Sequence, residues 1–162
     1  MSASVLRDHL IWAMVHAFDE GKGIEAQSLL NELKGLGPEQ AAWQPPGTGP
    51  SIWTSLNHVA VWEEKILKLT RGERVDFNSA WPQPDEITQQ AWKNDVEHLK
   101  AIHAKLIAHL NTLSDGDLTQ QVLNDDSHDF DWAMAYTGLV VHMAYHTGQI
   151  RMLKLLQGVE EE

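Results

Sequence analysis

Apolar residues recur every three or four positions along most of the chain, which is the period of one face of an α-helix. Four long stretches carry this pattern, residues 4–19, 52–69, 86–113 and 132–157, and a shorter one covers residues 24–34. In the second stretch Ile52, Val59 and Ile66 are spaced by seven and therefore mark one buried face. The pattern predicts an all-α protein, a four-helix bundle with a short extra helix after the first long one.

Glycine and proline separate these stretches. Gly21-Lys22-Gly23 ends the first helix, and residues 44–50 form a loop inside one domain because a helical pattern resumes at once. The whole chain, residues 1–162, is therefore predicted to be a single domain. Residues 70–84 are long for a connection between adjacent antiparallel helices, so we expect them to cross the length of the bundle or to cover a site. The acidic residues 124–129 do not match a calcium-binding loop and are interpreted as a solvated turn.

Composition excludes several kinds of site. The chain has no cysteine, so disulfides, zinc ribbons and cysteine nucleophiles are excluded. Its 23 acidic and 12 basic residues give a net charge of −11, from which we expect no nucleic-acid partner. The first residues lack a basic segment followed by an apolar core, and no run approaches the ~18 apolar residues of a membrane helix. We therefore expect a cytoplasmic protein with no membrane partner.

The fourth predicted helix carries the clearest chemical signal. His142 and His146 are four residues apart, so both imidazoles leave one helix face, and Gln149 follows on the same face. Such a pair also arises by chance in a chain with nine histidines, and packing is its alternative role. His58 lies at the edge of the buried face of the second long helix. The chain contains neither the Glu-x-x-His pairs of di-iron bundles nor the HExxH motif of zinc proteases. Three histidines from two helices instead suit a site for one metal ion that leaves some coordination positions open.

The same helix has a second apolar stripe, formed by Val141, Ala144, Gly148, Met152 and Leu155. A helix that is apolar over most of its circumference is buried on most sides. In a four-helix protein of this size, a partner subunit is one way to achieve that burial. We therefore predict a homodimer with this helix at or near the interface.

Two segments resemble the DinB/YfiT-like superfamily of metal-binding four-helix bundles: LGPEQAAWQPPGTGPSIWTSLNHVAVWE, from Leu36 to Glu63, and HMAYHTGQI, from His142 to Ile150. The resemblance covers most of the chain, and the pairing of the two segments is more specific than either alone. It implies an up-down-down-up bundle, usually dimeric, with a long crossover between helices two and three. It also implies that His58, His142 and His146 bind zinc or nickel.

Three neutral imidazoles would leave a divalent metal its full charge, which acidifies bound water or deprotonates a thiol. Each ring also needs an acceptor for its other nitrogen, and Ser55 and Gln149 are candidates. Trp62 and Tyr145 could wall the site, although bundle packing is their alternative role.

Three functions remain open. The resemblance implies a metal-dependent S-transferase that uses an external low-molecular-weight thiol, because the chain has no cysteine of its own. A metal-dependent hydrolase and a non-catalytic metal-binding stress-response protein are the alternatives. A small-molecule pocket that opens beside the histidines would favour an enzyme, and a site sealed by residues 70–84 would weaken that interpretation.

Overall fold

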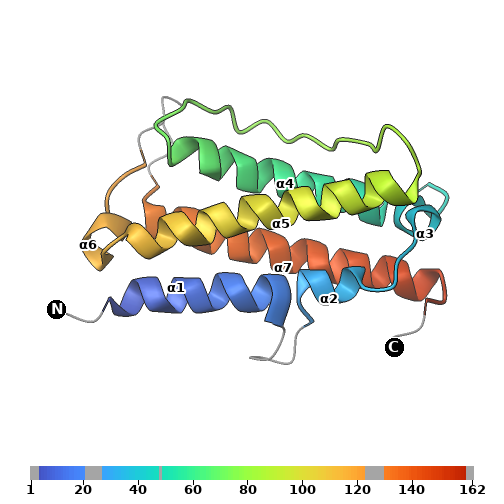
Figure 1. Ribbon diagram of the computed structural model, residues 1–162, viewed down its shortest axis with the longest axis horizontal. Helices are drawn as coiled ribbons and strands as arrows, with labels where there is room; N and C mark the ends of the chain where they lie inside the picture. Colours follow the sequence, from blue (N-terminus) through green and yellow to red (C-terminus); the bar gives the residue numbers. More distant parts are fainter. Residues whose placement is uncertain (1–3, 21–26, 48, 123–129, 160–162) are drawn as a thin grey trace.

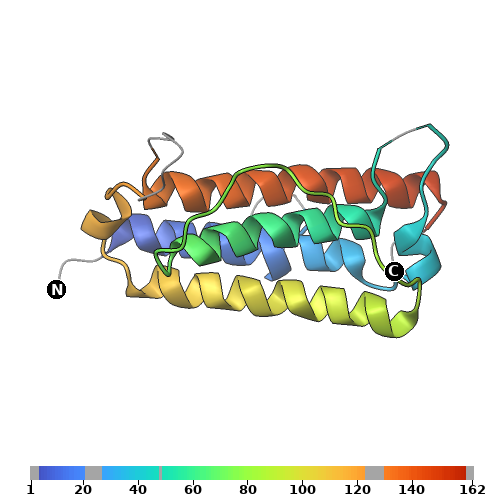
Figure 2. The same ribbon diagram turned by 90° about the horizontal axis from the view of Figure 1, so that it is seen from above.

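A computed structural model describes residues 4–20, 27–47, 49–122 and 130–159. Four long helical segments lie side by side along one axis (Figures 1 and 2). They are α1 (Val5–Val15), continued by a π-helical turn (His16–Glu20), α4 (Ile52–Leu69), α5 (Gln89–Thr112) and α7 (Trp132–Leu156). Within the described residues there is no strand, only an isolated bridge between Gln121 and Asp131. The prediction of an all-α bundle is confirmed.

The order of helix directions is up, down, down, up. In Figure 1 α1 and α7 run from left to right, whereas α4 and α5 run from right to left. Since α4 and α5 are parallel, the chain between them must return along the whole bundle, and it does so as an extended segment above α4 (Figures 1 and 2). This segment, residues 73–88, is called the crossover below.

Short helices connect the long ones: α2 (Leu29–Leu33), α3 (Pro38–Ala42) and α6 (Asp115–Leu118). The expected helix over residues 24–34 is thus shorter, and residues 21–26, with the predicted glycine break, lie outside the described part of the chain. Helix α3 was not predicted. It begins at Pro38, whose fixed φ suits a first helical position, and the Gln40 side chain accepts a hydrogen bond from Gly37 N at 2.9 Å.

Side-chain caps fix where the long helices begin. The Ser51 hydroxyl accepts from Thr54 N at 3.1 Å, and the Asp131 carboxylate accepts from Met134 N at 2.7 Å. Helix α5 starts at Gln89, three residues later than expected, because Thr88 caps it. The acidic residues interpreted as a solvated turn, 124–129, lie outside the described residues.

The core runs between the four long helices and contains a buried pair of ionisable side chains, Glu63 and His103. Trp53 on α4, Leu106 on α5 and Met143 on α7 are fully buried in it. The Glu63 carboxyl lies 2.9 Å from His103 Nδ1, and burial raises its pKa more than the bond to His103 lowers it. None of the helices in the described part of the chain has the length and apolar character that crossing a membrane requires.

A second buried carboxylate joins α2 to α7. Glu32 is 2 % exposed, and its two oxygens accept from Arg151 at 3.1 Å and from Lys154 at 3.2 Å. The Lys154 side chain is itself buried. Because a buried carboxylate needs partners, these contacts hold the short helix α2 in a fixed place against the end of α7.

Candidate metal centre

Three histidine rings from two helices converge on one point. His58 comes from α4, and His142 and His146 come from successive turns of α7. The Nε2 atom of His142 lies 3.1 Å from that of His58 and 3.1 Å from that of His146. Within the described part of the chain, these three residues form the one group of three or more His, Asp or Glu side chains that could hold a metal ion. The structure therefore brings together the three histidines that were predicted as metal ligands.

The outward nitrogens of two rings are bonded to oxygen. His58 Nδ1 lies 2.6 Å from the carbonyl oxygen of Ala80, and His146 Nδ1 lies 2.7 Å from Gln149 Oε1. A carbonyl oxygen only accepts, so His58 carries its proton on Nδ1, and the contact with Gln149 places the His146 proton likewise. Both Nε2 lone pairs then point inward. This is the arrangement by which metal-binding histidines are normally oriented.

The surroundings keep the rings neutral. Burial lowers the pKa of all three histidines. The pKa of His142 falls to about 4, first through burial and then through the charges that His146 and His58 would carry. A neutral imidazole is the form that binds metal, so the lowered pKa values leave the three nitrogens available at neutral pH.

The spacing of the nitrogens fits a small divalent ion. Three nitrogens bound at ~2.05 Å to a tetrahedral zinc ion would lie roughly 3.3 Å apart. The two measured separations of 3.1 Å are close to that value, and the three ligand atoms all lie within 4.8 Å of one another. The residues present therefore fit a divalent metal with three protein ligands.

The crossover covers one side of the three rings. The Trp81 indole stacks on His58 with ring centroids 3.7 Å apart and an interplanar angle of 3°. The same indole meets the edge of His146 at 5.5 Å. Neither Trp81 nor the Ala80 carbonyl was a predicted site component. The crossover shows no sequence period, and a backbone carbonyl carries no residue-specific signal.

The other residues that were predicted to lie beside the metal ligands differ in what they contact. Trp62 lies 5.6 Å from His142, ring to ring, and Tyr145 lies 5.0 Å from His146 with 62 % of its surface exposed. Gln149 bonds His146, as described above. The Ser55 hydroxyl donates to the Ser51 carbonyl at 2.9 Å inside its own helix, so the acceptor beside His58 is supplied by Ala80 and not by Ser55.

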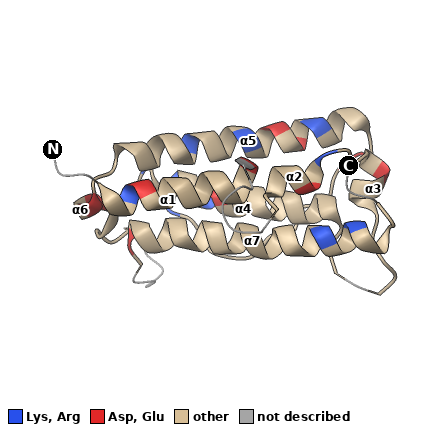
Figure 3. Cartoon of the chain, turned by 90° about the horizontal axis from the view of Figure 1, so that it is seen from below, with Lys and Arg blue, Asp and Glu red and all other residues tan. Residues whose placement is uncertain are grey.

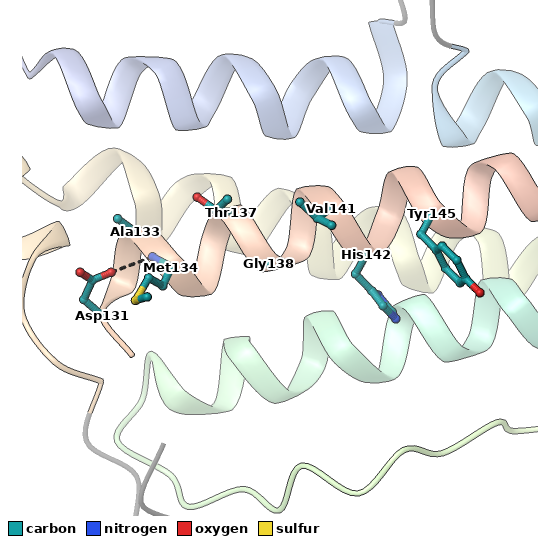
Figure 4. A pocket seen from close by; sticks show the side chains of 8 residues that line it. All are labelled: Asp131, Ala133, Met134, Thr137, Gly138, Val141, His142 and Tyr145. Carbon is teal, nitrogen blue, oxygen red and sulfur yellow. Dashed lines mark hydrogen bonds between the residues drawn. The ribbon is translucent and has the colours of Figure 1, made fainter. Parts of the chain in front are cut away.

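Two hollows adjoin His142, so the crossover does not seal the site. A cavity of about 300 Å³ lies between α4, the crossover and α7, with His142 in its wall. A larger, open hollow of about 730 Å³ lies on the outer face of α7, and Figure 4 shows the His142 ring extending from this helix toward α4. Met134, Gly138 and His142 line both spaces.

Comparison with known proteins adds two findings. The sequence model of the DinB superfamily matches residues 24–150. The fold is similar to that in the crystal structure of the colibactin self-resistance protein ClbS in complex with a double-stranded DNA, with a TM-score of 0.62 and 16 % identity over 91 % of this chain and 95 % of that chain. None of the curated proteins matches the chain.

The prediction that the protein has no nucleic-acid partner is wrong. ClbS, which has the same fold, was crystallised with double-stranded DNA. The net charge of −11 is a sum over the whole molecule, whereas a duplex touches one face. Affinity for phosphates depends on the Lys and Arg side chains of that face, so the total charge does not exclude such a partner.

Proposed function

The chain belongs to the DinB superfamily, and from this premise we propose that it is a metal-dependent enzyme whose divalent ion is held by His58, His142 and His146. The observation that carries the proposal is the convergence of three Nε2 atoms while the outward nitrogens of His58 and His146 are bonded to oxygen. Buried histidines that only pack would bond carbonyls or water, and would not bring three Nε2 atoms together at one point.

We propose thiol transfer to an electrophile as the reaction. A divalent ion with three neutral ligands supplies Lewis-acid activation of a thiol or of water. The thiol must come from a small molecule, because the chain has no cysteine. Hydrolysis is the alternative at the same site, and zinc or nickel is the expected metal.

The protein residues contribute orientation and exclusion of water. Ala80 and Gln149 fix the tautomers of His58 and His146, and Trp81 covers the ring of His58. The apolar cavity beside His142 supports an enzyme over a non-catalytic metal-binding protein, because it offers a small molecule a place next to the ligand nitrogens.

Activity assays on zinc-loaded and nickel-loaded protein test this function. Protein would be incubated with an aryl halide and a series of low-molecular-weight thiols, and separately with p-nitrophenyl esters without thiol. We expect metal-dependent, thiol-dependent product that is lost in His142→Ala. Ester cleavage without thiol would favour the hydrolase, and no turnover of either substrate by metal-loaded protein would favour the non-catalytic role.

We also propose that the protein is a homodimer through the outer face of α7. Five apolar or aromatic side chains of this helix are each more than half exposed: Met134, Val141, Tyr145, Met152 and Leu156. Figure 3 shows no Lys, Arg, Asp or Glu along most of α7. Exposed apolar side chains this numerous on one helix favour an interface.

DNA binding is a second candidate function, favoured by the likeness to ClbS. A groove of about 590 Å³ between α2 and α5 has Lys34, Lys93 and Lys100 in its walls and supports this candidate. Fluorescence anisotropy with a labelled duplex at several salt concentrations tests it. We expect binding that weakens steeply with salt and in Lys93→Glu, whereas no binding at low salt would contradict it.

A further inference from the structure

The cavity beside His142 is walled by aromatic rings from three separate segments. Trp62 comes from α4, Phe77 from the crossover, and Phe130 from the residues before α7. The rings of Trp62 and Phe77 are 6.0 Å apart, and those of Phe77 and Phe130 are 5.8 Å apart. The cavity has a volume of about 300 Å³, and its three half-buried rings offer a small molecule an apolar surface to pack against.

The chemistry of the wall selects an uncharged ligand. Besides the three rings, the described residues that line the cavity are Ile66, Met134, Ala135, Gly138, Leu139 and His142. Apart from His142, none of the side chains in this wall is ionisable at neutral pH. A charged ligand would lose its hydration there without gaining an ion pair, whereas an apolar ring would bury its surface against aromatic side chains.

Gly138 leaves space in the wall of the cavity. Apart from its chain neighbours and its own helix backbone, no atom would lie within 4 Å of a Cβ atom at this position. Gly138, Met134 and His142 belong to the walls of both the inner cavity and the outer hollow. Figure 4 shows Gly138 on α7 between Met134 and His142.

We infer that this cavity binds a neutral one-ring or two-ring apolar molecule, which packs against Gly138 and lies with one end against His142. The volume is at the lower end of the ~300–1,000 Å³ range of small-molecule sites, which sets the size of the ligand. The inference names the substrate class for the proposed function and rests on it for the reaction. Binding itself needs only the cavity.

Fluorescence titration with the neutral two-ring probe 6-propionyl-2-(dimethylamino)naphthalene tests the inference, on both chelator-treated and zinc-loaded protein. We expect saturable binding by both forms of the wild type. Gly138→Leu should weaken binding at least tenfold because its side chain would occupy space at the wall of the cavity, and Phe77→Ala should weaken it by removing one aromatic wall. The matched control is Gly148→Leu, which lies on the same exposed face of α7 outside both spaces and should bind as the wild type does.

Equal binding by Gly138→Leu and the wild type would overturn the inference, as would an equal loss in Gly148→Leu or an absence of saturable binding in the wild type. Circular dichroism identifies a variant that does not fold, in which case Phe77→Ala, located on the crossover, decides the question. If the proposed metal centre were wrong but the cavity proposal right, the protein would take up no metal and would still bind the probe.

Discussion

The His58 ring donates its Nδ1 proton to the carbonyl oxygen of Ala80, 2.6 Å away and 22 positions later in the chain. This bond ties a ligand on α4 to the extended crossover. The crossover is thus more than a connection between two parallel helices. It fixes the tautomer of His58 and, through Trp81, covers the same ring.

Trp81→Ala should weaken zinc binding about tenfold, which is the scale of effects seen when groups that orient metal ligands are removed. The reason is the loss of the indole that stacks on His58 at 3.7 Å, which would let both the ring and the adjoining Ala80 carbonyl move. Competition with a chromophoric chelator measures the change in dissociation constant.

The matched control for this variant is Trp12→Ala. Trp12 is also a partly exposed tryptophan stacked on a histidine, His16, with ring centroids 4.3 Å apart, but it lies on α1 and contacts none of the three candidate ligands. We expect its zinc affinity to equal that of the wild type. An equal loss in both variants would mean that Trp81 has no specific role in orienting His58.

The stability of the metal-free protein should fall in mild acid. The pKa of His142 is about 4 in the folded chain, below its value of 6.5 in the unfolded chain, so the unfolded chain binds the proton more readily. The contribution of neutral His142 to the free energy of unfolding is therefore complete above pH 6.5 and is lost as the pH falls toward 4. We expect a loss on the order of 2 kcal/mol, allowing for partial exposure of the ring.

Urea denaturation between pH 7 and pH 4.5 measures this loss, with His142→Asn for comparison. The variant should lose less free energy of unfolding over this range, because it lacks one of the histidines that must stay neutral. The lowered pKa values of His58 and His146 act in the same direction, so part of the dependence should remain. If the free energy of unfolding changed with pH identically in the variant and the wild type, His142 would be excluded as a source of the pH dependence.

Glu32→Ala should destabilise the fold by about 3 kcal/mol, since removing one partner of a buried ion pair leaves the other charge unpaired. Lys154 is buried and its Nζ atom lies 3.2 Å from Glu32 Oε2. The exposed Glu39 on α3 provides the control, and Glu39→Ala should change the free energy of unfolding little. Equal unfolding midpoints for both variants would show that Glu32 does not hold α2 on α7.

Val141→Glu should convert the proposed dimer to monomer. Val141 is 63 % exposed near the middle of the apolar face of α7, and a carboxylate there would lose its hydration on association. Sedimentation velocity over a range of concentrations measures the change, with Ala104→Glu on the exposed face of α5 as control. A wild type that stays monomeric throughout would contradict the proposed interface.

Helical periodicity predicted the long elements well, because burial on one face of a bundle imposes a repeat that the sequence must carry. Helix α4 has the predicted bounds, Ile52–Leu69. The short helix α3 was missed because Pro38 and the glycine before it were interpreted as separating two helical stretches. In the structure the same proline begins the helix and the same glycine is its cap.

The candidate site was predictable to the extent that it lies on helices. The spacing of His142 and His146 follows from the helical period, but their meeting with His58 depends on how α4 packs on α7, which only the family resemblance could indicate. The parts on extended chain, the Ala80 carbonyl and Trp81, could not be predicted, because their positions depend on the path of the crossover over α4.

The metal content of protein purified without chelator or nickel resin tests the central claim most directly. Elemental analysis would compare the wild type with His142→Ala and with His98→Ala, whose histidine is exposed on α5 and bonded to Glu64. We predict about one zinc or nickel ion per chain in the wild type and in His98→Ala, and none in His142→Ala. A wild type that holds no metal, even after incubation with zinc and with nickel, would contradict the metal centre and leave a helical bundle whose three histidines only pack.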